Sequence, residues 1–263
     1  MARAAAAQYF VIGAMARDIL LTHVHGIGTG LATRDIDFAV AVDDWTGFDR
    51  IRNALLESRR CEPSGTLHRL VYRPDPASRG IPLDLIPFGG VEQPPGALAW
   101  PPDGGVRMNV AGHPEVLAHA VSVQLAPDVT VLVASLAGLA ILKLFAWQDR
   151  GNENPKDAGD LALLMRHHAK AGNEDRLYGA DGDLLERAGF DPDHASPALL
   201  GRDARRMASP QTRLQLIELL ESARQSERLA LHLARSLRAF DDPIERAQQM
   251  LADFLHELRE DLR

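Results

Sequence analysis

The stretch that decides the fold is Thr33-Arg34-Asp35-Ile36-Asp37-Phe38-Ala39-Val40, where two carboxylates stand two residues apart at the start of an apolar run. Side chains of a strand alternate between its two faces, so Asp35 and Asp37 are expected on the same face. Like charges this close repel unless a cation lies between them. The pattern therefore predicts a strand over 35–42 that carries a divalent-metal site, whereas a solvated strand end is the plainer alternative.

A second informative stretch lies upstream, at Val11-Ile12-Gly13-Ala14-Met15-Ala16-Arg17-Asp18. It predicts an apolar strand that ends at a glycine where a helix begins. Backbone N–H groups at such a junction suit phosphate, so Gly13 and Ala14 are expected to bind a nucleotide. Arg17 could reach a phosphate, and Asp18 could fix the helix or Arg34. A surface ion pair between Arg17 and Asp18 is an equally simple interpretation.

Composition limits the class of protein. The chain has 263 residues, is 46% hydrophobic and carries a formal net charge of −7, which argues against wholesale coating of nucleic acid. Its one cysteine, Cys61, allows no internal disulfide and favours a reducing, cytoplasmic compartment. The start of the chain does not resemble a signal peptide, and polar residues interrupt the longest apolar run, at 129–147. No contact with a membrane is therefore expected.

Alternating and helical patterns divide the chain near residue 134. We expect an α/β (α+β) domain over 1–134, with a mixed sheet flanked by helices, and a mainly helical C-terminal domain over 135–263 that completes the active site. The expected strands are 8–12, 35–42, 67–73, 81–88 and 129–133. The expected helices are 14–24, 46–59, 114–120, 135–149, 155–169, 183–188, 196–207, 210–240 (with a split allowed) and 243–262. Ser135 and Asn154 are expected as N-caps, the latter followed by proline.

Asp84 is the candidate third metal ligand. It stands alone among apolar residues in Ile81-Pro-Leu-Asp-Leu-Ile-Pro-Phe, in the middle of an expected strand. A lone carboxylate there is costly to ionise unless it is paired or bound to a metal. If its strand lies beside that of Asp35 and Asp37, three carboxylates come together and can hold one or two Mg²⁺ or Mn²⁺ ions.

Lysines are rare in this chain, only three among 29 basic residues. Lys143 lies in an apolar helix, where its ammonium needs a structural carboxylate or a substrate phosphate, unless it extends to solvent. Lys156 and Asp157 fall in the first turn of the next expected helix. End-capping explains the aspartate but not the lysine, whose charge is unfavourable there, so both are expected near the site.

Together these motifs resemble the nucleotidyltransferase superfamily of the DNA polymerase β type. The stretch at 11–18 looks like the opening of poly(A) polymerases and CCA-adding enzymes. The run Leu139-Ala-Ile-Leu-Lys143-Leu-Phe-Ala, then Arg150-Gly, then Lys156-Asp157-Ala-Gly-Asp160-Leu, is similar to AbiEii-type nucleotidyltransferase toxins of type IV toxin–antitoxin systems. The resemblance covers about residues 9–166.

The resemblance implies an enzyme that moves a nucleoside monophosphate from an NTP to an acceptor, most directly the 3′ end of tRNA or another RNA, with Mg²⁺ or Mn²⁺. In the family, the carboxylates matching Asp35 and Asp37 hold the metal, the lysine matching Lys143 contacts the triphosphate, and the aspartate matching Asp157 assists near the acceptor. Asp84 sits where the family varies. The expected catalytic residues are Asp35, Asp37, Asp84 and Asp157, and the expected nucleotide-binding residues are Gly13, Ala14, Arg17, Arg34, Lys143 and Lys156.

The resemblance also implies a toxin with a cognate antitoxin. The family motif is usually Gly-Ser, whereas this chain has Gly13-Ala14, so backbone N–H groups must replace a hydroxyl. Two other functions stay open. One is a nucleotidyltransferase with a small-molecule or protein acceptor, which the mildly acidic charge favours. The other is a catalytically degenerate nucleotide-binding module, against which the retained Asp35, Asp37, Lys143 and Lys156 argue.

Overall fold

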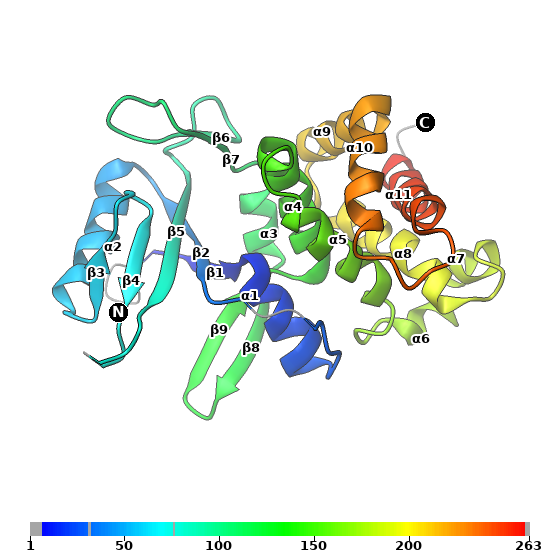
Figure 1. The fold of residues 1–263 in the computed structure, drawn as a ribbon, viewed down its shortest axis with the longest axis horizontal. Helices are drawn as coiled ribbons and strands as arrows, with labels where there is room; N and C mark the ends of the chain where they lie inside the picture. The colour runs from blue at the N-terminus through cyan, green and yellow to red at the C-terminus, as the bar shows by residue number, and fades with distance from the viewer. Residues whose placement is uncertain (1–6, 31–32, 76, 261–263) are drawn as a thin grey trace. The chain divides into compact units, whose positions relative to one another are not determined.

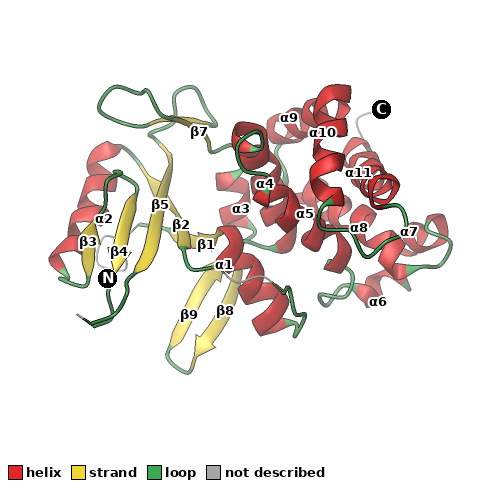
Figure 2. Cartoon of the chain, in the orientation of Figure 1, coloured by secondary structure: helices red, strands yellow, loops and turns green. Residues whose placement is uncertain are grey.

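The computed structural model describes residues 7–30, 33–75 and 77–260 (Figure 1). Contacts along the chain divide it into two compact units. Unit 1 comprises Met1–Ala16 and Gly30–Ala134, and unit 2 comprises Arg17–Thr29 and Ser135–Arg263. The described strands all lie in unit 1, whereas the described part of unit 2 is helical (Figure 2). The segment Arg17–Thr29 thus groups with the helical unit and not with the rest of the first 134 residues.

Unit 1 is built on a seven-stranded mixed sheet, which confirms the expected fold class. The strand order is β3-β4-β5-β2-β1-β9-β8, with β2–β5 and β1–β9 parallel and the other neighbours antiparallel. The strands are β1 (Tyr9–Ile12), β2 (Ile36–Val42), β3 (Cys61–Pro63), β4 (Arg69–Tyr72), β5 (Ile81–Gly89), β8 (Val121–Ala126) and β9 (Val129–Val133). The short strands β3 and β8 were not expected from the sequence.

The register of the sheet aligns Asp37 and Asp84 with Arg69 across neighbouring strands. Ile12 pairs with Asp37, Asp37 pairs with Asp84, and Asp84 pairs with Arg69. Residues paired across adjacent strands point to the same face, so one row across four strands carries two carboxylates and a guanidinium. Asp35 precedes β2 by one residue and is not part of the strand.

Helix α2 (Trp45–Glu57) follows β2 and is capped by Asp44, whose side chain accepts a hydrogen bond from the backbone N–H of Gly47. Its first turn supplies an aromatic cluster. The ring centroids of Trp45 and Phe48 lie 5.6 and 5.8 Å from that of Trp100. Strands β6 (Ala97–Ala99) and β7 (Arg107–Asn109) form a separate two-stranded ribbon that was not expected from the sequence, and α3 (His113–Ala118) follows them.

The helix expected over 14–24 begins one residue earlier and changes type. Helix α1 (Gly13–Asp18) is continued by a π-helix (Ile19–Val24). In the π-helical part Ile19, Leu20 and Leu21 are buried. A π-helical segment of this kind often occurs at functional sites.

In unit 2, helix α4 (Leu136–Arg150) begins as expected at Ser135, whose hydroxyl accepts from the N–H of Gly138. The expected start of α5 (Lys156–His167) was wrong. Pro155 is the N-cap residue, not the first helical one, and the Asn154 side chain accepts from the N–H of Lys156. Proline has no N–H, so Lys156 is the first donor that Asn154 can satisfy.

With one exception, the remaining helices of unit 2 overlap the helical segments that were expected from the sequence. The segment 210–240 splits at Ser222, whose backbone is extended, and α8 begins four residues earlier than expected because Asp191 caps it. A short additional helix, α6, was not expected. These helices are α6 (Glu174–Leu177), α7 (Gly182–Arg187), α8 (Pro192–Met207), α9 (Pro210–Glu221), α10 (Ala223–Ala234) and α11 (Pro243–Arg259).

Candidate active site

Three carboxylates of unit 1 form a cluster that we call the acidic triad: Asp35, Asp37 and Asp84. Each offers one oxygen, and these oxygens all lie within 4.8 Å of one another. Parallel pairing of β2 with β5 explains the meeting, because Asp37 and Asp84 are register partners. Carboxylate oxygens are the ligands that Mg²⁺ and Mn²⁺ prefer, so the donor set fits such an ion.

Gly13 lies directly against the triad. Its φ is +70°, and a Cβ atom there would stand 2.0 Å from Oδ2 of Asp37. Both the backbone conformation and the close approach therefore require glycine. The strand-to-helix turn expected to bind phosphate is thus next to a triad carboxylate.

Arg69 is a residue of this site that the sequence interpretation missed. Its Nε donates to Asp84 Oδ1 at 2.7 Å and its Nη2 donates to Asp84 Oδ2 at 2.6 Å. Asp84 is 7% exposed, whereas the Arg69 side chain is 42% exposed. The sequence predicted strands over 67–73 and 81–88, but the register that pairs Arg69 with Asp84 could not be predicted from it.

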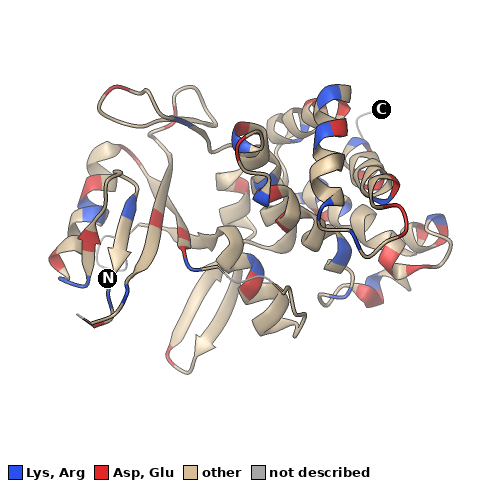
Figure 3. Ribbon diagram, in the orientation of Figure 1, with Lys and Arg blue, Asp and Glu red and all other residues tan. Residues whose placement is uncertain are grey.

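The pKa of Arg69 indicates that it faces the whole triad. The hydrogen bonds that Arg69 donates to Asp84 raise this pKa above its usual value, partial burial opposes the shift, and the charges of Asp84, Asp35 and Asp37 raise it further. Figure 3 shows acidic positions on β2 and β5 and a basic position on β4. Arg69 is therefore a permanent cation beside three carboxylates.

A second set of charged residues lies in unit 2, and we call it the ionic network: Arg17, Asp18, Lys143, Arg150, Asp157 and Asp160. Lys143 Nζ lies 2.9 Å from Asp157 Oδ1 and also contacts Asp160. Lys143, Asp157 and Asp160 are all buried. Lys143 was expected to bind a structural carboxylate or a substrate phosphate, or to extend to solvent. In the structure its ammonium binds structural carboxylates and does not extend to solvent.

The other members close the network. Arg17, which is 2% exposed, donates to Asp18 at 2.8 Å and to Asp160. Arg150 Nε donates to Asp157 Oδ2 at 2.7 Å. A buried charge is tolerated when it is paired and hydrogen-bonded, and every member of this network meets that condition.

The pKa values reflect this pairing. Burial works against the charged form of Lys143, but the charges of Asp157 and Asp160 outweigh it and raise the pKa of Lys143 above its usual range. Burial likewise opposes ionisation of Asp157, yet Lys143 and Arg150 hold its pKa below the usual range. Both groups are therefore charged at neutral pH.

The remaining expected site residues are more exposed. Arg34 is exposed beside Asp35, Ala14 is partly buried in α1, and Lys156 is exposed at the first position of α5. The expected residues divide between the units. Gly13, Ala14, Arg34 and the triad belong to unit 1, and Arg17, Lys143, Lys156 and Asp157 belong to unit 2.

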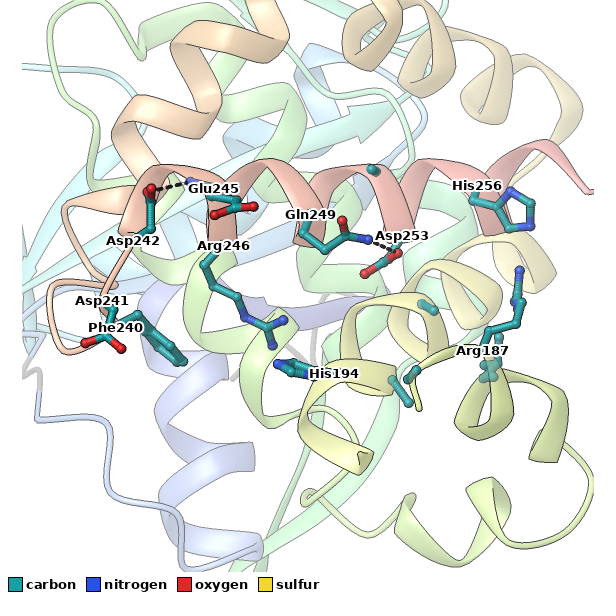
Figure 4. A pocket seen from close by; sticks show the side chains of 15 residues that line it. Arg187, His194, Phe240, Asp241, Asp242, Glu245, Arg246, Gln249, Asp253 and His256 are labelled. Atoms are coloured by element: carbon teal, nitrogen blue, oxygen red, sulfur yellow. Dashed lines mark hydrogen bonds between the residues drawn. The ribbon is translucent and has the colours of Figure 1, made fainter. Parts of the chain in front are cut away.

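A cavity of about 880 Å³ lies within unit 2 (Figure 4). Side chains of α11, including Arg246, Gln249 and Asp253, line it together with His194 of α8. None of the expected site residues lines this cavity. Both charge signs occur around it, so its lining does not indicate one class of ligand.

Comparison with known proteins adds a family to this geometry. No curated protein matches the chain. In the part of the chain that the structure describes, no helix is long and apolar enough to cross a membrane. The family described as "Nucleotidyl transferase AbiEii toxin, Type IV TA system" matches residues 32–256, most of the chain, including the triad, Lys143 and Asp157. The chain therefore belongs to the AbiEii nucleotidyl transferase toxin family of type IV toxin–antitoxin systems.

Proposed function

We propose that this chain transfers a nucleoside monophosphate from an NTP to the 3′ end of tRNA, with Mg²⁺ or Mn²⁺ held by the acidic triad. The observation that carries the proposal is the meeting of Asp35, Asp37 and Asp84 oxygens within 4.8 Å in a chain of a nucleotidyl transferase family. A bound divalent ion neutralises triphosphate charge and lowers the pKa of an attacking hydroxyl.

The proposed step exchanges the phosphoanhydride bond between the α- and β-phosphates of the NTP for a phosphoester bond to the acceptor. The acceptor hydroxyl loses its proton and bonds to the α-phosphorus, and the bond from that phosphorus to pyrophosphate breaks. Gly13 and Ala14 would offer backbone N–H groups to the phosphates, because Ala14 has no hydroxyl. In this proposal Arg17, Arg34 and Lys156 supply positive charge to the nucleotide.

Lys143 and Asp157 have a coupled role in the proposal. Their contact of 2.9 Å and complete burial mean that a triphosphate oxygen can bind Lys143 only by sharing or replacing a carboxylate. Release of Asp157 from Lys143 would then free a carboxylate for the acceptor side. This exchange is consistent with the family roles of both residues.

The test incubates the full chain with each α-labelled NTP, Mg²⁺ and total tRNA. Label on tRNA is expected with one or more NTPs, and it should disappear with EDTA or after periodate oxidation of the tRNA 3′ end. Asp37→Asn should lower incorporation by about 10³-fold, because one triad charge is lost. Asp49→Asn, at an exposed position of α2, is the matched control and should keep activity.

Other outcomes decide between acceptors. Label on protein or on a small molecule, with none on tRNA, would replace tRNA by that acceptor. No label on any acceptor, from a folded protein with every NTP and both metals, would leave only a nucleotide-binding module. As a member of a toxin family, the chain is also proposed to have a cognate antitoxin, which co-purification with the product of a neighbouring gene would test.

A further inference from the structure

Arg69 binds one carboxylate of the acidic triad. Its guanidinium makes two hydrogen bonds, of 2.7 and 2.6 Å, to the two oxygens of Asp84. Asp84 is itself the register partner of Asp37. A fork of this kind is among the stronger contacts that a carboxylate makes in proteins, and it engages both oxygens at once.

The exposure of the two partners is unequal. Asp84 is buried, but 42% of the Arg69 side chain is exposed. The Arg69 side chain can therefore rotate into solvent without exposing buried residues, whereas Asp84 is held within the core.

Charge gives Arg69 a reason to compete with a metal. Arg69 is hydrogen-bonded to both oxygens of Asp84, and an oxygen of Asp84 lies within 4.8 Å of oxygens of Asp35 and Asp37. A divalent ion and a guanidinium attracted to the same carboxylates repel each other at this range. The presence of one therefore weakens the binding of the other.

We propose, building on the metal-dependent transfer proposed above, that Arg69 is an internal counter-ion of the acidic triad. It holds Asp84 while the site is free of metal and yields that carboxylate when a divalent ion binds. Arg69 thus limits metal affinity, and it is a positioning residue that acts through Asp84.

The test measures Mn²⁺ binding to the full chain by electron paramagnetic resonance of free Mn²⁺, without nucleotide. Arg69→Gln should tighten binding by about tenfold, because the competing charge is gone. The Mn²⁺ affinity of Arg69→Lys should lie between those of the wild type and Arg69→Gln, since lysine keeps the charge but loses the two-hydrogen-bond contact. In EDTA, Arg69→Gln should have a lower melting temperature than the wild type. Addition of Mn²⁺ should raise the melting temperature of Arg69→Gln by more than it raises that of the wild type.

The matched control is Arg73→Gln. Arg73 follows β4 and also contacts a carboxylate, with Nε 2.9 Å from Glu62 Oε2, but Glu62 is outside the triad. This variant should bind Mn²⁺ as the wild type does. Weaker or unchanged binding by Arg69→Gln would overturn the counter-ion proposal, because a residue that merely orients Asp84 for the metal predicts that result.

Failure of this inference differs from failure of the proposed function. If the wild type binds Mn²⁺ and Asp37→Asn does not, the metal site stands and only the Arg69 variants judge the counter-ion. If neither wild type nor Arg69→Gln binds Mn²⁺, the metal site itself is wrong and both proposals fall.

Discussion

The carboxylates of the acidic triad in unit 1 and those of the ionic network in unit 2 differ in their surroundings. The network combines three carboxylates with Arg17, Lys143 and Arg150, and its central members are buried. In the triad, Asp84 is buried and bound by Arg69, but Asp35 and Asp37 are only partly buried. The carboxylates of the network are thus mostly shielded from solvent, whereas two of the triad carboxylates are accessible to it.

This difference follows from the cost of removing charge from water. A buried ion cannot recruit a counter-ion from solvent, so the chain itself must supply one. A partly exposed cluster can be completed by an exchangeable cation. The network therefore contributes to the stability of unit 2 while no substrate is bound, whereas the triad is suited to binding and release of a cation.

The largest effect on stability is expected where the balanced network is broken. Lys143→Met leaves Asp157 and Asp160 buried without their shared ammonium, so the free energy of unfolding should fall by about 3 kcal/mol. Urea unfolding measures it. Lys170→Met is the matched control, because Lys170 lies 2.8 Å from Asp193 but both side chains are about half exposed. That control should change stability by less than about 1 kcal/mol. Equal losses in the two variants would contradict the contrast.

A smaller effect is expected at the partly exposed triad. Gly13→Ala places a Cβ atom 2.0 Å from Asp37 Oδ2 at a φ of +70°, so it should cost about 2 kcal/mol and weaken Mn²⁺ binding. Gly26→Ala has the same backbone strain, with φ +68°, but its Cβ meets nothing within 4 Å. The control should cost only about 1 kcal/mol and leave Mn²⁺ binding unchanged. If both variants bind Mn²⁺ normally, Gly13 does not shape the triad.

The smallest effect concerns a buried group of unit 1 that is kept neutral instead of paired. His113 is 6% exposed, its Nδ1 donates to the carbonyl of Val110 at 2.8 Å, and its Nε2 has no hydrogen-bond partner among the described residues. Burial lowers the pKa of His113, although the Val110 carbonyl and nearby acidic groups oppose the shift. The unfolded chain therefore binds this proton first as the pH falls.

Stability should consequently decrease as the pH drops below about 6.5, by at most about 1.4 kcal/mol per pH unit from this group. His113→Asn keeps a donor near the Val110 carbonyl but does not titrate. Its free energy of unfolding should depend less on pH between 7 and 5 than that of the wild type, whatever its absolute stability. Parallel pH profiles would show that unit 1 does not hold this histidine neutral.

Much of the fold was predictable because it depends on local patterns. Apolar runs located β1, β2 and β9, and the cap at Ser135 forms as expected. The errors occurred where local signals are weak or ambiguous. Strand β3 has three residues, and the Asn-Pro signal at 154–155 placed the helix start one residue too early. The split at Ser222 depends on a single extended residue.

The sequence by itself determined which chemical groups are available: an Asp-x-Asp pair, a lone carboxylate among apolar residues, a strand-ending glycine and a lysine in an apolar helix. Residue type and short-range periodicity are written in the chain, so these could be read directly. Only the tertiary structure decided the partners. Strand register places Arg69 in contact with Asp84, and helix packing places Lys143 in contact with Asp157 and Asp160. Pairing between distant segments depends on how the whole core packs, which no local pattern specifies.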